Sequence, residues 1–170
     1  RFVGGGGNDV INGGTGNDTL IGVNPTTTQP CRGEIDYVNG WDNGDRFVLG
    51  DLSNVYFDDA DPTSDGAADF ARVVSFAPSQ GATIQRHGSA SDYRLVSVSG
   101  GTQIILDKSG TELDEIIARI EFSPTELSLT ESYFIYVSAV DTTAPVLANL
   151  PPDMLVEATM PSGAVVTFSL

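Results

Sequence analysis

The sequence contains few basic residues. Lysine and arginine together account for 8 of its 170 residues, against 23 aspartates and glutamates, and the formal net charge is −15. Such a chain offers no basic face to nucleic acid or to an anionic lipid surface. We therefore expect no nucleic-acid partner and no membrane insertion, and a divalent cation is the natural counter-charge for so acidic a chain.

Cysteine and histidine each occur once, and long apolar runs are absent. Cys31 has no second cysteine with which to form an intrachain disulfide, and we interpret it as a bystander thiol. His87, beside Gly88, is expected in a turn, since a zinc site would need more ligands than one histidine offers. No His-Glu-x-x-His or Gly-x-Ser-x-Gly motif occurs, so the sequence predicts no catalytic and no cofactor-binding residue. No apolar run approaches the length of a transmembrane helix.

What the chain does contain is a nine-residue phrase repeated in tandem. Residues 4–12 read Gly-Gly-Gly-Gly-Asn-Asp-Val-Ile-Asn, and residues 13–21 read Gly-Gly-Thr-Gly-Asn-Asp-Thr-Leu-Ile. The glycines permit a tight turn with positive φ and leave backbone carbonyls uncovered. The aspartate adds a hard anionic oxygen, and the aliphatic residue two positions later is expected to end a three-residue strand and to point inward. The pattern predicts a calcium-binding turn followed by a short strand.

The same register continues beyond the two intact copies. Aspartate recurs at multiples of nine, with an aliphatic or aromatic residue two positions later: Asp9 with Ile11, Asp18 with Leu20, Asp36 with Val38, and Asp45 with Phe47. Thr27 fills the intervening position, in a Pro/Thr-rich segment at 24–30 that has no glycine turn and is expected to be an exposed loop. The loop takes the place of one repeat and leaves the count of nine unbroken.

The phrase resembles the RTX nonapeptide, Gly-Gly-x-Gly-x-Asp-x-aliphatic-x, of bacterial hemolysin-type proteins. The resemblance implies a short parallel β-roll with Ca²⁺ bound between its turns. It also implies metal ligands from the turn glycines and the acidic residues of the repeats: Gly5, Gly7, Asp9, Gly14, Gly16, Asp18, Glu34, Asp36 and Asp45. Glu34 stands where glycine is usual, so it either supplies an oxygen or spoils the turn.

The resemblance also implies which turns face each other. In the β-roll of that family one repeat is half a coil, so an ion lies between turns eighteen residues apart. This spacing pairs Asp18 with Asp36, where we expect the best site. It pairs Asp9 with Thr27, which carries no carboxylate, so the edge with Asp9 and Asp45 is expected to be weaker.

The glycine-rich and acidic segments allow other interpretations. Clusters of Gly, Asn and Asp are commonly plain turns or flexible linkers, but four aspartates in one register favour calcium. A phosphate loop is excluded because no Lys-Ser/Thr follows the glycines and no helix begins there. The acidic loop at 51–66 departs from the EF-hand pattern. It is either a solvated loop or a loop in which Asp59, Asp61 and Asp65 bind a calcium ion.

Strand-like segments dominate the rest of the chain, at 46–49, 72–76, 93–98, 103–106, 115–122 and 134–137. We predict an all-β protein with a calcium-binding β-roll at 1–50, a β-rich continuation and cap of the roll at 51–140, and a C-terminal segment at 141–170. The run from Asp69 to Gly88 resembles the segment that follows the repeats in RTX proteins. Residues 145–170 resemble the opening strands of a HYR-type, immunoglobulin-like module of extracellular and adhesion proteins, and supply only part of such a sandwich.

Three functions are compatible with these features. The first is a non-enzymatic structural module of a large secreted or cell-surface bacterial protein, which folds on binding calcium. The second is a self-assembling fibre or surface-layer subunit that donates its C-terminal strands to a neighbour. The third is the non-catalytic C-terminal part of a secreted RTX enzyme. All three imply an extracellular location.

Overall fold

A computed structural model describes residues 1–28, 30, 32–122 and 126–139. Residues Arg1–Ala139 form one compact unit. Cys31 and the predicted C-terminal segment at 141–170, with its HYR-like strands at 145–170, lie outside the described residues, so the interpretations placed on them stay predictions.

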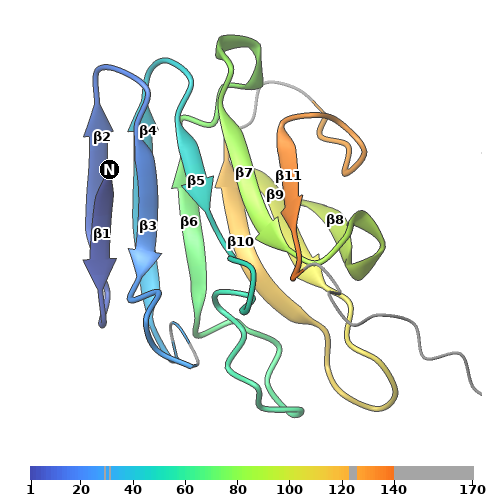
Figure 1. The fold of residues 1–170 in the computed structure, drawn as a ribbon. Helices are drawn as coiled ribbons and strands as arrows, with labels where there is room; N and C mark the ends of the chain where they lie inside the picture. Colours follow the sequence, from blue (N-terminus) through green and yellow to red (C-terminus); the bar gives the residue numbers. More distant parts are fainter. Residues whose placement is uncertain (29, 31, 123–125, 140–170) are drawn as a thin grey trace, which may run out of the picture. The chain divides into compact units, whose positions relative to one another are not determined.

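The described residues form two β-sheets (Figure 1). The strands are, in chain order, β1 Phe2–Gly5, β2 Val10–Gly14, β3 Thr19–Val23, β4 Ile35–Trp41, β5 Arg46–Val48, β6 Phe70–Val74, β7 Thr83–His87, β8 Tyr93–Val98, β9 Gly101–Leu106, β10 Glu115–Glu121 and β11 Phe134–Val137. Two short 3₁₀ helices, Pro78–Gln80 and Ala90–Asp92, complete the regular structure of this part of the chain. The prediction of an all-β protein is confirmed. Within the described ranges, no helix is long and apolar enough to cross a membrane.

Successive strands alternate between the two sheets as far as β7. The first sheet has the order β1-β3-β5-β7-β11, and all its neighbours pair in parallel. The second has the order β2-β4-β6-β10-β9-β8, in which β9 and β8 are antiparallel additions. Crossings from the first sheet to the second lie at the bottom of Figure 1, which we call the lower edge, and the return crossings lie at the upper edge.

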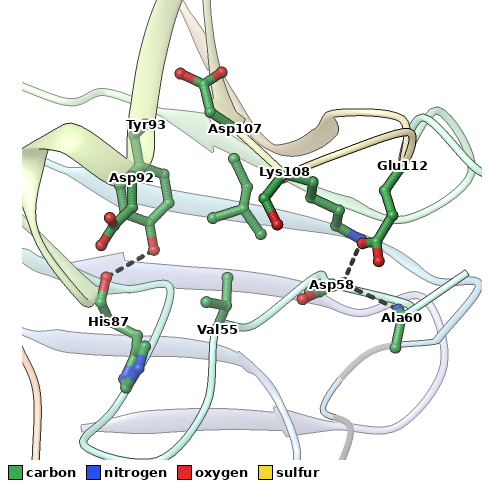
Figure 2. A pocket seen from close by; sticks show the side chains of 11 residues that line it. Val55, Asp58, Ala60, His87, Asp92, Tyr93, Asp107, Lys108 and Glu112 are labelled. Carbon is green, nitrogen blue, oxygen red and sulfur yellow. Dashed lines mark hydrogen bonds and ion pairs between the residues drawn. The ribbon is translucent and has the colours of Figure 1, made fainter. Parts of the chain in front are cut away.

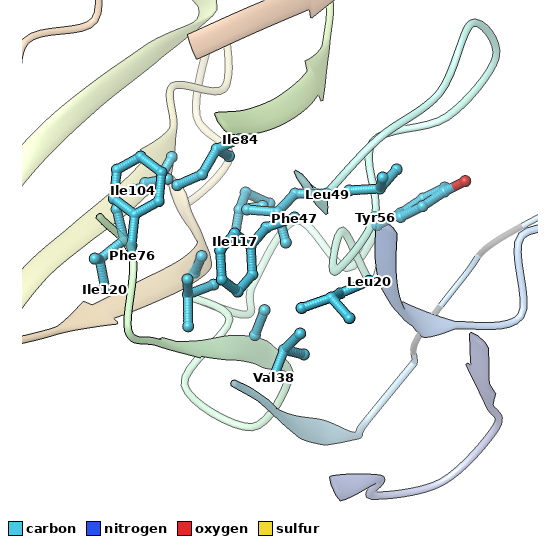
Figure 3. Packing of buried hydrophobic residues seen from close by; sticks show 14 of the residues in the cluster. Leu20, Val38, Phe47, Leu49, Tyr56, Phe76, Ile84, Ile104, Ile117 and Ile120 are labelled. Carbon is cyan, nitrogen blue, oxygen red and sulfur yellow. The ribbon is translucent and has the colours of Figure 1, made fainter. Parts of the chain in front are cut away.

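The core consists of apolar side chains that stack in rows across each sheet. One row joins paired residues of the first sheet: Leu20, Phe47, Ile84 and Phe134. The other joins paired residues of the second sheet: Ile11, Val38, Val73 and Ile120. All eight are buried and belong to one cluster, part of which is shown in Figure 3. The predicted inward position of the aliphatic or aromatic residue two places after each repeat aspartate is confirmed.

The register between coils corrects the predicted pairing of Asp18 with Asp36. Phe2 pairs with Leu20, eighteen positions later, as expected. However, Val10 pairs with Tyr37 and Leu20 with Phe47, in each case 27 positions later. The crossing from β3 to β4 therefore contains nine extra residues relative to that from β1 to β2, and the described residues of the Pro/Thr-rich segment form no strand. Asp18 and Asp36 consequently lie at opposite edges.

Two local predictions were also wrong. His87 is the last residue of β7, and only Gly88, with φ of 80°, begins the turn. Ile11 does not end its strand, because β2 continues to Gly14 and pairs along its length with β4. The predicted strands after residue 45 all occur, with shifts of a few residues at their ends.

Candidate metal sites

The repeat turns keep one backbone shape even where their sequence has diverged. In the turn between β2 and β3, Gly14 and Gly16 have φ of 86° and 107°. Trp41 and Asn43, which occupy the corresponding positions between β4 and β5, have φ of 81° and 70°. Side chains rarely adopt this left-handed conformation. Its persistence in two non-glycine residues shows that the stacked turns share a single geometry.

The first glycine of each turn leaves room for the aspartate that closes the turn. A Cβ atom added to Gly4 would lie 2.5 Å from Asp9 Oδ2, and one added to Gly40 would lie 2.4 Å from Asp45 Oδ2. A Cβ added to Gly22 would lie 2.4 Å from Asp36 Oδ2. The glycine and aspartate are five positions apart in the first two cases and fourteen in the third, so the nine inserted residues lie inside this turn.

Hydrogen bonds link each turn to the next turn on its own edge. At the lower edge, the Asp9 N–H donates to Asp36 Oδ1 at 2.8 Å. At the upper edge, the Asp18 N–H donates to Asp45 Oδ1 at 2.9 Å. Both pairs are 27 residues apart. The structure therefore brings together Asp9 with Asp36 and Asp18 with Asp45.

The second oxygen of three repeat aspartates is buried without a hydrogen-bond partner: Asp9 Oδ2, Asp36 Oδ2 and Asp45 Oδ2. Asp36 is 0 % exposed. Burial raises the pKa of Asp36 to about 6, the Asp9 N–H opposes this, and the charges of Glu34 and Asp9 add to it. Burial likewise raises the pKa of Asp45, against the opposing N–H of Asp18. Buried anionic oxygens of this kind require a proton or a cation.

Glu34 joins the lower-edge group. Its side chain is buried and accepts a hydrogen bond from the Gly7 N–H, again across 27 residues. It therefore does not disrupt the stack of turns. The predicted ligands consequently form two groups: Gly5, Gly7, Asp9, Glu34 and Asp36 at the lower edge, and Gly14, Gly16, Asp18 and Asp45 at the upper edge. A hard cation such as Ca²⁺ is suited to carboxylate and carbonyl oxygens of this kind.

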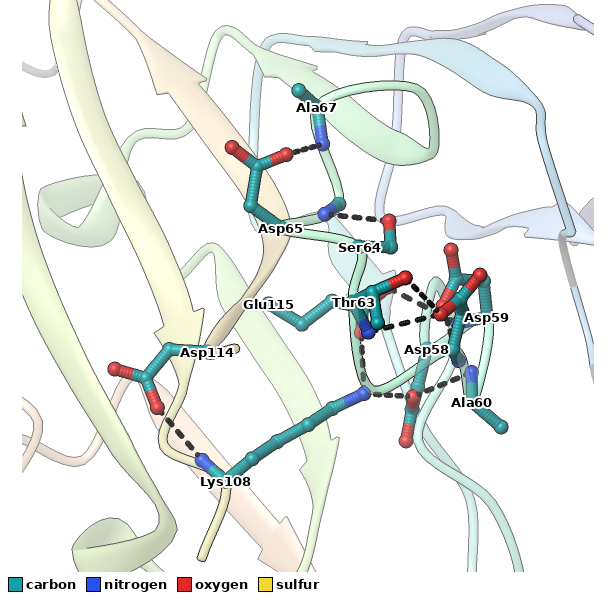
Figure 4. Close-up of polar contacts among 12 residues, drawn as sticks. Asp58, Asp59, Ala60, Thr63, Ser64, Asp65, Ala67, Lys108, Asp114 and Glu115 are labelled. Atoms are coloured by element: carbon teal, nitrogen blue, oxygen red, sulfur yellow. Dashed lines mark hydrogen bonds and ion pairs between the residues drawn. The ribbon is translucent and has the colours of Figure 1, made fainter. Parts of the chain in front are cut away.

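A third acidic group, not predicted as a unit, lies beyond the repeats. One carboxylate oxygen from each of Asp58, Asp59 and Glu115 lies within 4.8 Å of the others, so the three can hold a metal ion. The Asp59 N–H donates to Glu115 Oε1 at 3.1 Å. Lys108 binds both Asp58, at 2.8 Å, and Glu115 (Figure 4). Glu115 is 56 positions from Asp59, which is why sequence spacing could not reveal it.

The ion suggested for Asp59, Asp61 and Asp65 does not match this geometry. Asp61 accepts hydrogen bonds from the N–H and hydroxyl of Thr63, at 2.9 and 2.7 Å. Asp65 is exposed and accepts one from the Ala67 N–H at 3.1 Å. Both side chains thus close local turns, and only Asp59 belongs to the acidic group.

A hollow of about 490 Å³ lies beside this acidic group, and Asp58 and Lys108 line part of it (Figure 2). Two other polar residues that line it, Tyr93 and His87, make hydrogen bonds within the fold. The Tyr93 hydroxyl donates to the His87 carbonyl at 2.8 Å, and His87 Nδ1 lies 2.8 Å from the Asp51 carbonyl oxygen. These contacts account for the single histidine as a structural residue.

Comparison with protein-family models finds no family that matches this chain. Comparison with curated proteins finds no match either. The interpretation of the acidic groups therefore rests on the repeat residues and on the geometry described above.

Proposed function

We propose that this chain is an extracellular, calcium-binding structural module of RTX type, in which the strands of residues 1–50 form a parallel β-roll. It has no catalytic role in this proposal. The observation that carries it is the set of three buried aspartate oxygens without hydrogen-bond partners, one in each of three repeat turns. Calcium ions between stacked turns would neutralise these oxygens.

The proposed mechanism is folding coupled to ion binding. Without a cation, the carboxylates of adjacent turns repel each other, and glycine-rich turns lose much conformational entropy when they become ordered. An ion that binds only the folded state adds its binding free energy to folding. The chain would therefore be loose where calcium is scarce and ordered at the millimolar concentrations found outside cells.

The lower edge is the stronger of the two proposed sites. Asp9, Glu34 and Asp36 would hold an ion there with three carboxylates, and the turn carbonyls would complete the oxygen ligands. Asp18 and Asp45 would hold an ion at the upper edge with two. Because calcium affinity rises with the number of charged ligands, the lower edge is expected to fill first.

A calcium titration followed by circular dichroism and thermal melting tests the proposal. Two occupied sites at a hundredfold excess over Kd add about 5 kcal/mol, which raises the melting temperature by about 10–20 °C. Magnesium at equal concentration serves as the control, because it accepts irregular oxygen sites poorly. A strand signal and a melting temperature that are the same in calcium and in excess chelator would refute the proposal.

Self-assembly is a second candidate, favoured by one observation. Among the described strands, β1 and β2 are the first strands of the two sheets, and each has one edge without a strand partner. Both carry exposed apolar side chains, with Val10 71 % exposed. Open apolar strand edges promote pairing with another chain. Sedimentation of the chain in calcium tests this candidate, and a monomer at high concentration would contradict it.

A further inference from the structure

The starts of strands β6 and β10 bring another buried carboxylate, that of Asp69, close to the acidic group of Asp58, Asp59 and Glu115. The two strands are parallel neighbours, with Ala71 opposite Ala118. Asp69 immediately precedes β6, and Glu115 is the first residue of β10. The N-terminal ends of the two strands therefore place both side chains at the lower edge, where the acidic loop that carries Asp59 also lies.

Asp69 is the unusual member of this set. It is 1 % exposed, and neither of its carboxylate oxygens has a hydrogen-bond partner. Burial raises its pKa to about 6, and the charges of Asp59, Glu115 and Asp58 add to that rise. The backbone N–H of Gly33 opposes the rise, although no hydrogen bond of normal length and angle joins it to either Asp69 oxygen. The carboxylates whose charges raise the pKa of Asp69 are thus the three members of the acidic group.

Lys108 neutralises only part of this group. Its ammonium binds Asp58 and Glu115, and its side chain is 8 % exposed (Figure 4). Four carboxylates and one ammonium carry a formal charge of −3 in a largely buried place. No ion pair to Asp59 or Asp69 occurs among the described residues, so the remaining charge is concentrated on their side of the group.

We propose that Asp59, Asp69 and Glu115 bind a hard divalent cation, Ca²⁺ in an extracellular setting, with Lys108 and Asp58 as the flanking ion pair. All the donors are carboxylate oxygens, which suits Ca²⁺ and excludes a site built for softer metals. The ion would tie the acidic loop to the starts of β6 and β10. This site is independent of the proposed ions in the repeat turns, since it shares no ligand with them.

Calorimetric titration of the 170-residue chain with Ca²⁺ tests the site through three variants. Asp69→Asn is expected to lower the number of bound ions by one or to weaken one class of sites at least tenfold. Asp59→Asn, at a less buried position, is expected to do the same and guards against a folding defect of the first variant. Asp65→Asn is the matched control, because it removes one charge from the same loop and keeps its local turn.

The outcomes separate this site from those in the repeats. Loss of a site in Asp69→Asn and Asp59→Asn, with wild-type binding in Asp65→Asn, supports the proposal. Wild-type stoichiometry and affinity in both Asp69→Asn and Asp59→Asn overturns it. Asp36→Asn is expected to leave this site intact. If Asp36→Asn and Asp45→Asn bind like the wild type while Asp69→Asn does not, the repeat sites fail and this site stands.

Discussion

The molecule buries carboxylates in two different ways. In the repeat turns, Asp36 and Asp45 each bind a backbone N–H of the neighbouring turn, and no cationic side chain is paired with them in the described structure. In the acidic group near β10, Glu115 is equally buried but is paired with Lys108. In the proposed function the first arrangement leaves the charge to a bound ion, whereas the second carries part of its counter-charge within the chain.

This difference has a consequence for folding. A region whose counter-charge is a solute ion is stable only where that ion is present, whereas a region with its own lysine holds part of its structure without it. Residues near β6 and β10 are therefore expected to stay more ordered in chelator than the repeat turns. The predictions below test this contrast.

The largest effect is expected from Lys108→Met. It leaves Glu115, which is 0 % exposed, and Asp58 without their ammonium partner. Removing one member of a buried ion pair typically costs about 3–5 kcal/mol. Chemical denaturation in chelator measures this loss. Arg94→Met is the control, since the Arg94 ion pairs are about half exposed and are expected to contribute less than about 1 kcal/mol. Equal losses in the two variants would contradict the contrast.

The double variant Asp36→Asn, Asp45→Asn is expected to separate the two regions by their calcium response. In saturating calcium it should lose about 2–4 kcal/mol relative to the wild type, because the ions lose a charged ligand at each edge. In chelator it should be at least as stable as the wild type, since two buried charges are gone. Thermal melts in both conditions measure the crossover. A loss of equal size in both would show that these residues act only through packing.

A smaller effect is expected when the space beside Gly22, the first glycine of the turn that Asp36 closes, is filled by a methyl group. Gly22→Ala places a Cβ 2.4 Å from Asp36 Oδ2, and such overpacking typically costs about 1–3 kcal/mol. Gly6→Ala is the control, because no atom lies within 4 Å of its added Cβ. Denaturation in calcium is the measurement. If the two variants are equally stable, the Asp36 side chain does not need the space that Gly22 leaves.

A last effect concerns pH. Without calcium, Asp36 and Asp69 have pKa values of about 6 in the folded state, above their ordinary 3.8. The folded state thus binds protons more tightly, and stability should fall as pH rises from about 4 to about 6, by roughly 2 kcal/mol for each of the two groups. With saturating calcium the sign should reverse, because the ion requires the deprotonated form. Denaturation series at several pH values, with and without calcium, would show whether the two slopes differ in sign.

The repeats show how far sequence spacing could reach. It correctly identified the inward residues Ile11, Leu20, Val38 and Phe47, because side chains in a strand alternate and nine residues return the chain to the same position. The spacing failed to identify the residue that faces Asp18. A count of nine cannot reveal whether the segment at 24–30 forms a strand, and the coil length of 18 or 27 depends on that alone.

Long-range neighbours account for the remaining misses. Arg86 is fully buried, with its guanidinium 4.2–4.7 Å from the rings of Tyr93, Phe134 and Tyr136. Glu115 and Asp69 are buried beside the acidic loop. In the sequence these residues resemble ordinary charged positions of exposed strands and turns. Only the pairing of β6 with β10 and of β7 with β11 decides what surrounds them.

The sequence by itself determined the class of the fold, the positions of the repeat turns and the residue types able to bind calcium, because those follow from local glycine, aspartate and aliphatic spacing. The tertiary structure alone decided which carboxylates face each other. Asp9 meets Asp36, Asp18 meets Asp45, and Asp59 meets Glu115 across 56 positions, since strand pairing and the length of the inserted loops fix these distances. Whether a group of carboxylates can bind an ion depends on such distances, and residue spacing along the chain does not encode them.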